Sequence, residues 1–96
     1  MIVMDEENLH ARGWSHVLST TGDLLELDRF RLQVGAPRRA FHIRHTRRPH
    51  LDLRAEPRLR ALACPEVLVF RRTSDMLRYL RGLDAEADQL LGSTVS

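Results

Sequence analysis

The segment from residue 42 to 58 combines the side chains best suited to chemistry. It holds three of the five histidines, His42, His45 and His50, and an aspartate, Asp52, that follows the last of them by two positions. Imidazole exchanges protons near neutral pH and binds metals, and a neighbouring carboxylate can orient it. No nucleophile motif, phosphate-binding loop or complete metal motif accompanies the segment. It therefore predicts a polar site whose reaction the spacing leaves open.

Two residues earlier in the chain are candidates for the same site. Asp5 ends the apolar run of residues 1–4, which is typical of a buried strand that delivers a carboxylate at its carboxyl end. The alternative is an aspartate that only begins a loop. His16 lies in the β-compatible stretch 14–20 and shares a strand face with Trp14. It either packs in the interior or faces a pocket.

We expect His16, His50 and Asp52 to be the catalytic residues, with an imidazole as general acid or base and the carboxylate as its orienting partner. The same three would form a two-histidine, one-carboxylate set for a divalent metal. The residues expected to bind the ligand are Asp5, Arg39, His42 and Arg58. Because guanidinium groups match phosphate geometry, the expected activity is hydrolase-like on a nucleotide or other phosphate ligand, with water as the attacking group.

A buried polar network is the competing interpretation of these residues. In that case Asp52 accepts hydrogen bonds from His16 or Arg58 and links the sheet to the second helix. Such a network would stabilise the fold and bind nothing.

Two further functions stay open. Eight arginines lie in the range Arg38–Arg60, which suits a nucleic-acid-binding accessory protein, although Phe41 is the only large aromatic side chain among them. A non-catalytic interaction module, dimeric through Leu90 and Leu91, is the other alternative. The partner would be an anionic small molecule for the hydrolase, a nucleic acid for the accessory protein and a second copy of the chain for the interaction module.

The composition indicates one small domain. Ninety-six residues are too few for two separate cores, and because only 5% are aromatic, leucine and valine must fill most of the interior. All fifteen basic side chains are arginines. The single cysteine, Cys64, excludes an internal disulfide and is expected to be a small buried hydrophobe. No apolar run has the length of a membrane span, and the acidic start, Asp5 to Glu7, differs from a signal peptide, so we expect a soluble cytoplasmic protein without a membrane partner.

Hydrophobic periodicity indicates the elements that position the site. The clearest helix begins after Asp23, buries Leu27 and Phe30 along one stripe, and ends at Gly35. Alternation places His50 and Asp52 on one face if that segment is extended. The expected strands cover 1–4, 14–20, 40–43 and 67–70, and two more helices run from 57 to 63 and from 73 to 83. The expected core residues are Leu27, Phe30, Leu62, Val67, Val69 and Leu80.

This alternation of strands and helices predicts an α/β fold, a single small domain over residues 1–83 with a largely parallel sheet of about four short strands and about three helices. Residues 84–96 would form a tail that is partly helical or frayed. Parallel sheets bind ligands at the carboxyl ends of their strands, which would bring Asp5, His16 and the loop before His50 to one rim.

Several short motifs in a fixed order also give the chain a resemblance. They are MIVMD at 1–5, WSH at 14–16, VGAPRRAFH at 34–42, HLDL at 50–53, and Arg58 with Ala61. Over residues 1–83 this set resembles the short bacterial and phage proteins of domain of unknown function 4031. The chain departs from that family at His42, Leu51, Pro57 and Pro65, where the family usually has glutamine, an aromatic residue, lysine and glycine. The resemblance implies that His16, His50, Asp52 and Arg58 converge, and it transfers no activity.

Overall fold

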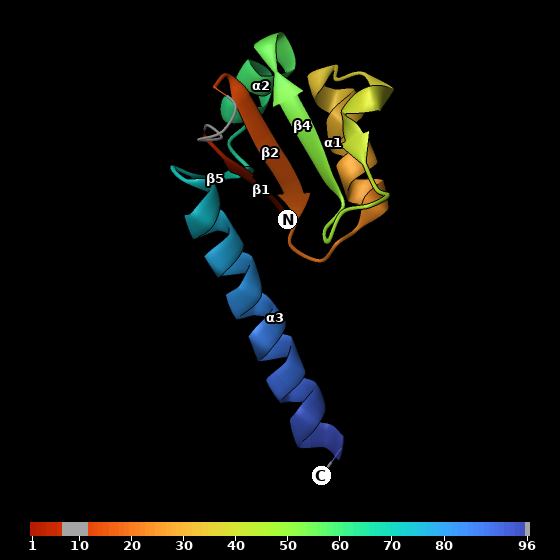
Figure 1. Cartoon of the computed structure of the whole chain (residues 1–96), viewed down its shortest axis with the longest axis vertical. Coiled ribbons are helices and arrows are strands. Elements are labelled where there is room, and N and C mark those ends of the chain that lie inside the picture. The colour runs from red at the N-terminus through yellow and green to blue at the C-terminus, as the bar shows by residue number, and fades with distance from the viewer. Residues whose placement is uncertain (7–11, 96) are drawn as a thin grey trace.

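The computed structural model describes residues 1–6 and 12–95. In chain order the elements are β1 (Ile2–Asp5), β2 (Trp14–Ser19), α1 (Leu24–Val34), the 3-10 helix η1 (Arg38–Ala40), β3 (Phe41–His42), β4 (His50–Arg54), α2 (Ala55–Leu62), β5 (Leu68–Phe70) and α3 (Thr73–Val95). The five strands form one sheet in the order β3-β4-β2-β1-β5. Helices α1 and α2 cover one face, and the first turns of α3 pack on the other (Figure 1).

The sheet is mixed and mostly antiparallel, so the prediction of a largely parallel, four-stranded sheet is wrong in both respects. Only β1 and β5 are parallel, whereas β1 with β2, β2 with β4, and β3 with β4 are antiparallel. The strand that the prediction did not count is β4. Parallel neighbours need a crossover of about a dozen residues or more, and the chain between β1 and β2 is shorter than that. The site therefore lies on a face of the sheet and not at a carboxyl edge.

Strand alternation separates an apolar face from a polar one. Leu51 and Leu53 of β4 are buried beneath α1 and α2, together with Val17 of β2. Their neighbours His50 and Asp52 consequently point to the opposite face, where α3 covers only the β1 side of the sheet. The uncovered part of that face carries the candidate site.

Helix α1 begins and ends where the sequence predicts. The side chain of Asp23 accepts hydrogen bonds from the backbone N–H groups of Leu25 and Glu26, which caps the helix start. Gly35 ends the helix with φ of 73°, a left-handed conformation that glycine adopts without strain.

Most of the expected core is confirmed. Leu27, Phe30, Val67 and Leu80 are buried. The other members differ because they lie at margins: Leu62 is half-buried at the end of α2, and Val69 is exposed on the edge strand β5. Cys64 is also only half-buried, and its thiol donates a hydrogen bond to the Glu66 carboxylate at 3.0 Å.

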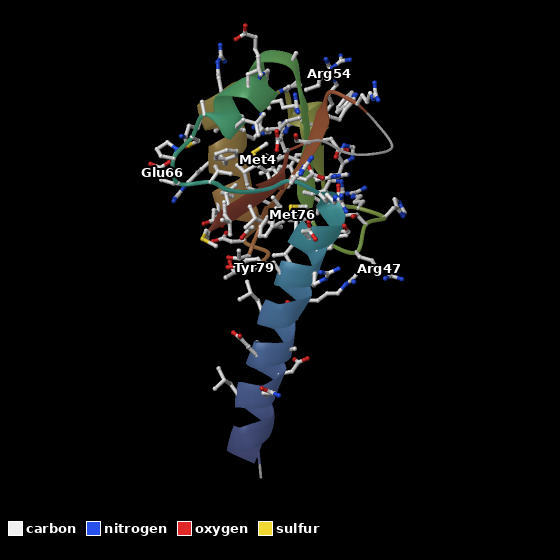
Figure 2. All side chains as sticks on the ribbon, turned by 90° about the vertical axis from the view of Figure 1, so that its left-hand side faces the viewer. Met4, Arg47, Arg54, Glu66, Met76 and Tyr79 are labelled. Atoms are coloured by element: carbon white, nitrogen blue, oxygen red, sulfur yellow. The ribbon has the colours of Figure 1, made fainter. Side chains whose placement is uncertain are left out.

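Helix α3 gives the molecule its elongated shape of 49 × 29 × 25 Å. Met76 and Leu80 pack on Val3 and Leu18, after which the helix runs past the end of the sheet (Figure 2). The segment expected to form a tail continues this helix as far as Val95. Among the described residues, no helix combines the length and hydrophobicity needed to cross a membrane.

Candidate functional site

Cross-strand pairing brings the polar residues of three strands together. His16 on β2 is the register partner of Asp52 on β4, and His42 on β3 is the partner of His50 on β4. Directly paired residues of antiparallel strands have neighbouring side chains on the same face. The rings of His42 and His50 stack with centroids 5.2 Å apart, and those of His16 and His50 meet edge to face at 5.8 Å.

Asp5 holds His16 in one orientation. The Asp5 side chain is fully buried at the end of β1, and its Oδ1 accepts the backbone N–H of His16 at 2.6 Å. Its Oδ2 lies 2.9 Å from His16 Nδ1 and also accepts the hydroxyl hydrogen of Thr73, the first residue of α3. An ionised carboxylate only accepts hydrogen bonds, so Nδ1 carries a proton. His16 Nε2 is then the nitrogen that gains and loses a proton.

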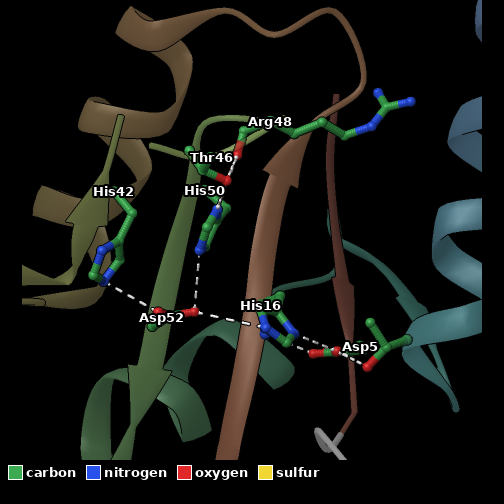
Figure 3. A network of polar contacts seen from close by, with 8 residues as sticks. Asp5, His16, His42, Thr46, Arg48, His50 and Asp52 are labelled. Atoms are coloured by element: carbon green, nitrogen blue, oxygen red, sulfur yellow. Dashed lines mark hydrogen bonds and ion pairs between the residues drawn. The ribbon is translucent and has the colours of Figure 1, made fainter. Parts of the chain in front are cut away.

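Asp52 lies at the centre of the three imidazoles, as Figure 3 shows. Its Oδ2 is 3.1 Å from His42 Nε2, and its Oδ1 is 3.5 Å from His50 Nε2 and 3.9 Å from His16 Nε2. Its side chain is 31% exposed, whereas that of Asp5 is 0% exposed. The buried carboxylate of Asp5 therefore contacts one histidine, whereas the carboxylate of Asp52 lies beside three and is partly exposed to solvent.

The loop before β4 fixes His50. His50 Nδ1 lies 2.9 Å from the carbonyl oxygen of Arg48, which can only accept, so Nδ1 carries a hydrogen and Nε2 faces Asp52. The Thr46 hydroxyl donates to the same carbonyl at 3.0 Å. These contacts position the second imidazole without any help from α3.

The contacts shift the pKa values of both pairs. The hydrogen bond to Asp5 raises the pKa of His16 above its usual 6.5 in spite of burial, and the contact with Asp52 raises that of His50 in the same way. Burial raises the pKa of Asp5, but hydrogen bonds from His16 and Thr73 outweigh it, and the pKa falls below 3.8. The contact with His50 lowers the pKa of Asp52 against its partial burial. On this face each carboxylate and its histidine partner thus favour each other's charged form.

An open pocket of about 560 Å³ lies between this face and α3, and we call it the arginine-lined pocket. His16 and His50 form its floor on the sheet side. The remaining residues that line it are Leu18, Thr46, Arg47, Arg48, Thr73, Met76, Leu77, Arg81 and Asp84. Arg48 is paired with Asp84. Within the described residues, neither Arg47 nor Arg81 has a recorded carboxylate partner, so these two arginines supply the positive charge of the pocket. The pocket is suited to an anion.

A second pocket, of about 450 Å³, lies on the other side of Asp52, and we call it the apolar pocket. Its lining is mostly hydrocarbon. The residues are Trp14, Ala36, Pro37, Arg39, Ala40, His42, Asp52, Leu53, Arg54, Ala55 and Pro57. The Arg54 guanidinium lies 5.1 Å from the centre of the Trp14 ring, in a cation-π contact.

The structure brings together five of the seven predicted site residues, Asp5, His16, His42, His50 and Asp52. Arg58 is on the opposite face, because its Nε donates to Ser15 Oγ at 2.9 Å and Ser15 alternates with His16 along β2. Arg39 lines the apolar pocket and takes no part in the histidine cluster. The sequence placed Thr73 only at the start of the last expected helix and gave no signal for Arg81, since neither lies near the histidines in the chain.

The predicted metal set lies in a cluster of polar contacts, in which Asp52 is 3.1 to 3.9 Å from the three histidines. Over residues 1–6 and 12–95, no group of three or more histidine, cysteine, aspartate or glutamate side chains is arranged to hold a metal ion. His16, His50 and Asp52, the predicted metal set, do lie together, at the separations given above.

Comparisons of the chain with models of protein families, with curated proteins and with solved structures gave no significant match. The resemblance to domain of unknown function 4031 accordingly stays a prediction.

Proposed function

We propose that the protein is a small hydrolase that binds a phosphate ester in the arginine-lined pocket and uses His16 as its general acid. The observation that carries this proposal is the fixed orientation of His16. A fully buried carboxylate holds its Nδ1, and its Nε2 faces the side of the sheet where the pocket opens. An imidazole restrained at one nitrogen and able to titrate at the other is suited to proton transfer.

Positive charge around the pocket supports binding of a phosphate. Arg47 and Arg81 approach from opposite sides, one from the loop before β4 and one from α3, and the imidazolium form of His50 adds a third cation. Guanidinium groups form paired hydrogen bonds with phosphate oxygens and stabilise the charge that spreads over them during transfer. Asp52, which lines the neighbouring apolar pocket, repels an anion there and keeps the phosphate on the arginine side.

The reaction that follows balances with water as the nucleophile. Water attacks phosphorus, a new P–O bond forms, and the bond between phosphorus and the ester oxygen breaks. The Nε2 proton of His16 passes to the departing alkoxide, which leaves as an alcohol. The dihydrogen phosphate that results returns a proton to His16, so the imidazolium is restored for the next turnover. The hydrogen bond to Asp5, which raises the pKa of His16, favours the acid form that this step needs.

The test is hydrolysis of an alkyl phosphate such as glycerol phosphate, measured as release of inorganic phosphate, with and without divalent metal. The His16→Gln variant should lose about 10²-fold or more in kcat, because it cannot donate the proton. The Arg81→Gln variant should mainly raise KM. His45→Asn is the matched control. His45 lies in the loop before β4, is exposed and makes no recorded contact with the histidine cluster, and asparagine tolerates its positive φ of 59°.

The pH profile provides a second readout. Activity should fall as pH rises through the pKa of His16, since the acid is then deprotonated. No phosphate release by wild type, or equal losses in His16→Gln and His45→Asn, would overturn the proposal.

A further inference from the structure

We propose that the apolar pocket is a nucleobase subsite, so that the ester bound by this protein is a nucleoside phosphate. This inference rests on the proposed function and specifies its substrate class. It assigns a role to Trp14 and to the walls around it, which the acid–base chemistry leaves unused.

The walls of the apolar pocket suit a flat heterocycle. Trp14, Pro37, Leu53 and Pro57 contribute apolar surface to a volume of about 450 Å³. The Arg54 guanidinium carbon lies over the indole, 5.1 Å from its centre, so the ring already takes part in a cation-π contact at the pocket. Nucleobases stack on aromatic rings and on guanidinium planes in the same manner, whatever their hydrogen-bonding edge. A purely polar anion would leave these walls without a contact.

The position of Asp52 links the two pockets into one site. His50 lines the arginine-lined pocket, and Asp52, two residues further along β4, lines the apolar pocket. Their Cα atoms are about 6.6 Å apart at the rise of an extended strand. A nucleoside phosphate separates its base from its phosphate by a sugar, and that sugar would lie over Asp52. A carboxylate accepts hydrogen bonds from sugar hydroxyls, so the same group that repels phosphate would bind a ribose.

Charge fixes the direction of the ligand. Polar and basic side chains dominate the pocket beneath α3, whereas hydrocarbon dominates the pocket beside η1. The phosphate is therefore expected next to His16, within reach of the proton that the proposed reaction needs, and the base next to Trp14.

The experiment uses the full chain and the fluorescence of Trp14, its only tryptophan. The probes are adenosine 5′-monophosphate, ribose 5-phosphate, adenosine and inorganic phosphate. Adenosine 5′-monophosphate should quench the tryptophan and bind at least about tenfold more tightly than ribose 5-phosphate, as expected for a stacked base. Ribose 5-phosphate should bind without quenching. A 5′-phosphorylated trinucleotide distinguishes a free nucleotide from the end of a strand, because its second nucleotide strengthens binding only in the latter case.

The Trp14→Leu variant, followed by calorimetry, tests the stacking residue. Its affinity for adenosine 5′-monophosphate should fall to the level of ribose 5-phosphate, and its affinity for ribose 5-phosphate should stay unchanged. If this variant does not fold, the amide shifts of Ala36 and Ala40 in wild type on addition of the nucleotide give the same information.

The outcomes separate the two proposals. Equal, quench-free binding of adenosine 5′-monophosphate and ribose 5-phosphate overturns the nucleobase subsite and leaves the phosphate-ester site standing. Binding of neither phosphate compound overturns both.

Discussion

Replacing Asp5 with asparagine tests the buried half of the site. The substitution preserves shape but removes the charge, and Asp5 makes three hydrogen bonds in a fully buried position: from the backbone N–H of His16, from its Nδ1–H, and from the hydroxyl of Thr73. Asparagine has one oxygen. If it keeps the bond to the backbone, its NH₂ group faces the other two donors, and the ring must shift its hydrogen to Nε2 to accept at Nδ1.

The cost follows from those contacts. Each hydrogen bond to a charged group contributes about 1.5 to 3 kcal/mol, and a neutral replacement recovers about 1 kcal/mol, so two altered bonds lose about 1 to 4 kcal/mol. For a domain of this size, a mid-range loss of about 2.5 kcal/mol lowers the melting temperature by about 10 to 20 °C. The pKa of His16 should fall as well, because the contact that raises it is gone.

Asp52→Asn is the matched control, since it makes the same change on the same face. The Asp52 side chain is 31% exposed, and water can replace much of what its charge contributes. The melting temperature should then change by only a few degrees, while binding of the nucleoside phosphate is weakened because its ribose loses a charged acceptor.

The assay is thermal unfolding followed by circular dichroism at pH 6, together with an NMR titration of the His16 ring. Asp5→Asn melting within about 3 °C of wild type, well below the shift expected from its contacts, or an unchanged titration midpoint for His16, would refute the reasoning. So would an equal loss of stability in both variants.

Four other changes have definite expected outcomes. Stability should decrease as pH rises through the folded pKa values of His16 and His50, because both are raised above 6.5 in the folded state. It should also decrease as pH falls through the pKa values of Asp5 and Asp52, because both are lowered in the folded state. Denaturant titrations between pH 3 and 9 will check both effects. Met76→Ala should cost about 2 to 5 kcal/mol in denaturant unfolding, since this side chain is fully buried on the sheet; a cost below 1 kcal/mol would show that α3 is not docked. A chain ending at Ala87 keeps every α3 residue of the core and should melt within a few degrees of the full chain. If nucleic acid binds instead of a nucleotide, replacing Arg47 and Arg48 together should flatten the dependence of log affinity on log salt by about two contacts, and salt-independent binding would exclude that function.

Local patterns in the sequence determined much of what lies within single elements. The capping aspartate, the apolar stripe and the terminal glycine specified α1 because each acts over a few residues. Alternation in His50–Leu53 placed two leucines in the core and the imidazole and carboxylate on the opposite face, since side chains of a strand alternate whatever its neighbours are. In the same way, the apolar run before Asp5 predicted a buried strand that ends in a carboxylate.

Only the tertiary structure decided which of these residues meet. With β2 between β1 and β4, His16 lies between Asp5 and Asp52, and the register pairs His16 with Asp52 directly. A slip of one residue would have turned His16 to the other face, where Arg58 lies. Strand order and register depend on contacts between distant segments, and so does the arrival of Thr73 and Arg81 on α3 beside the histidines. Local periodicity contains no information about those contacts, so the sequence predicted the chemical groups and the long-range pairing assembled them into a site.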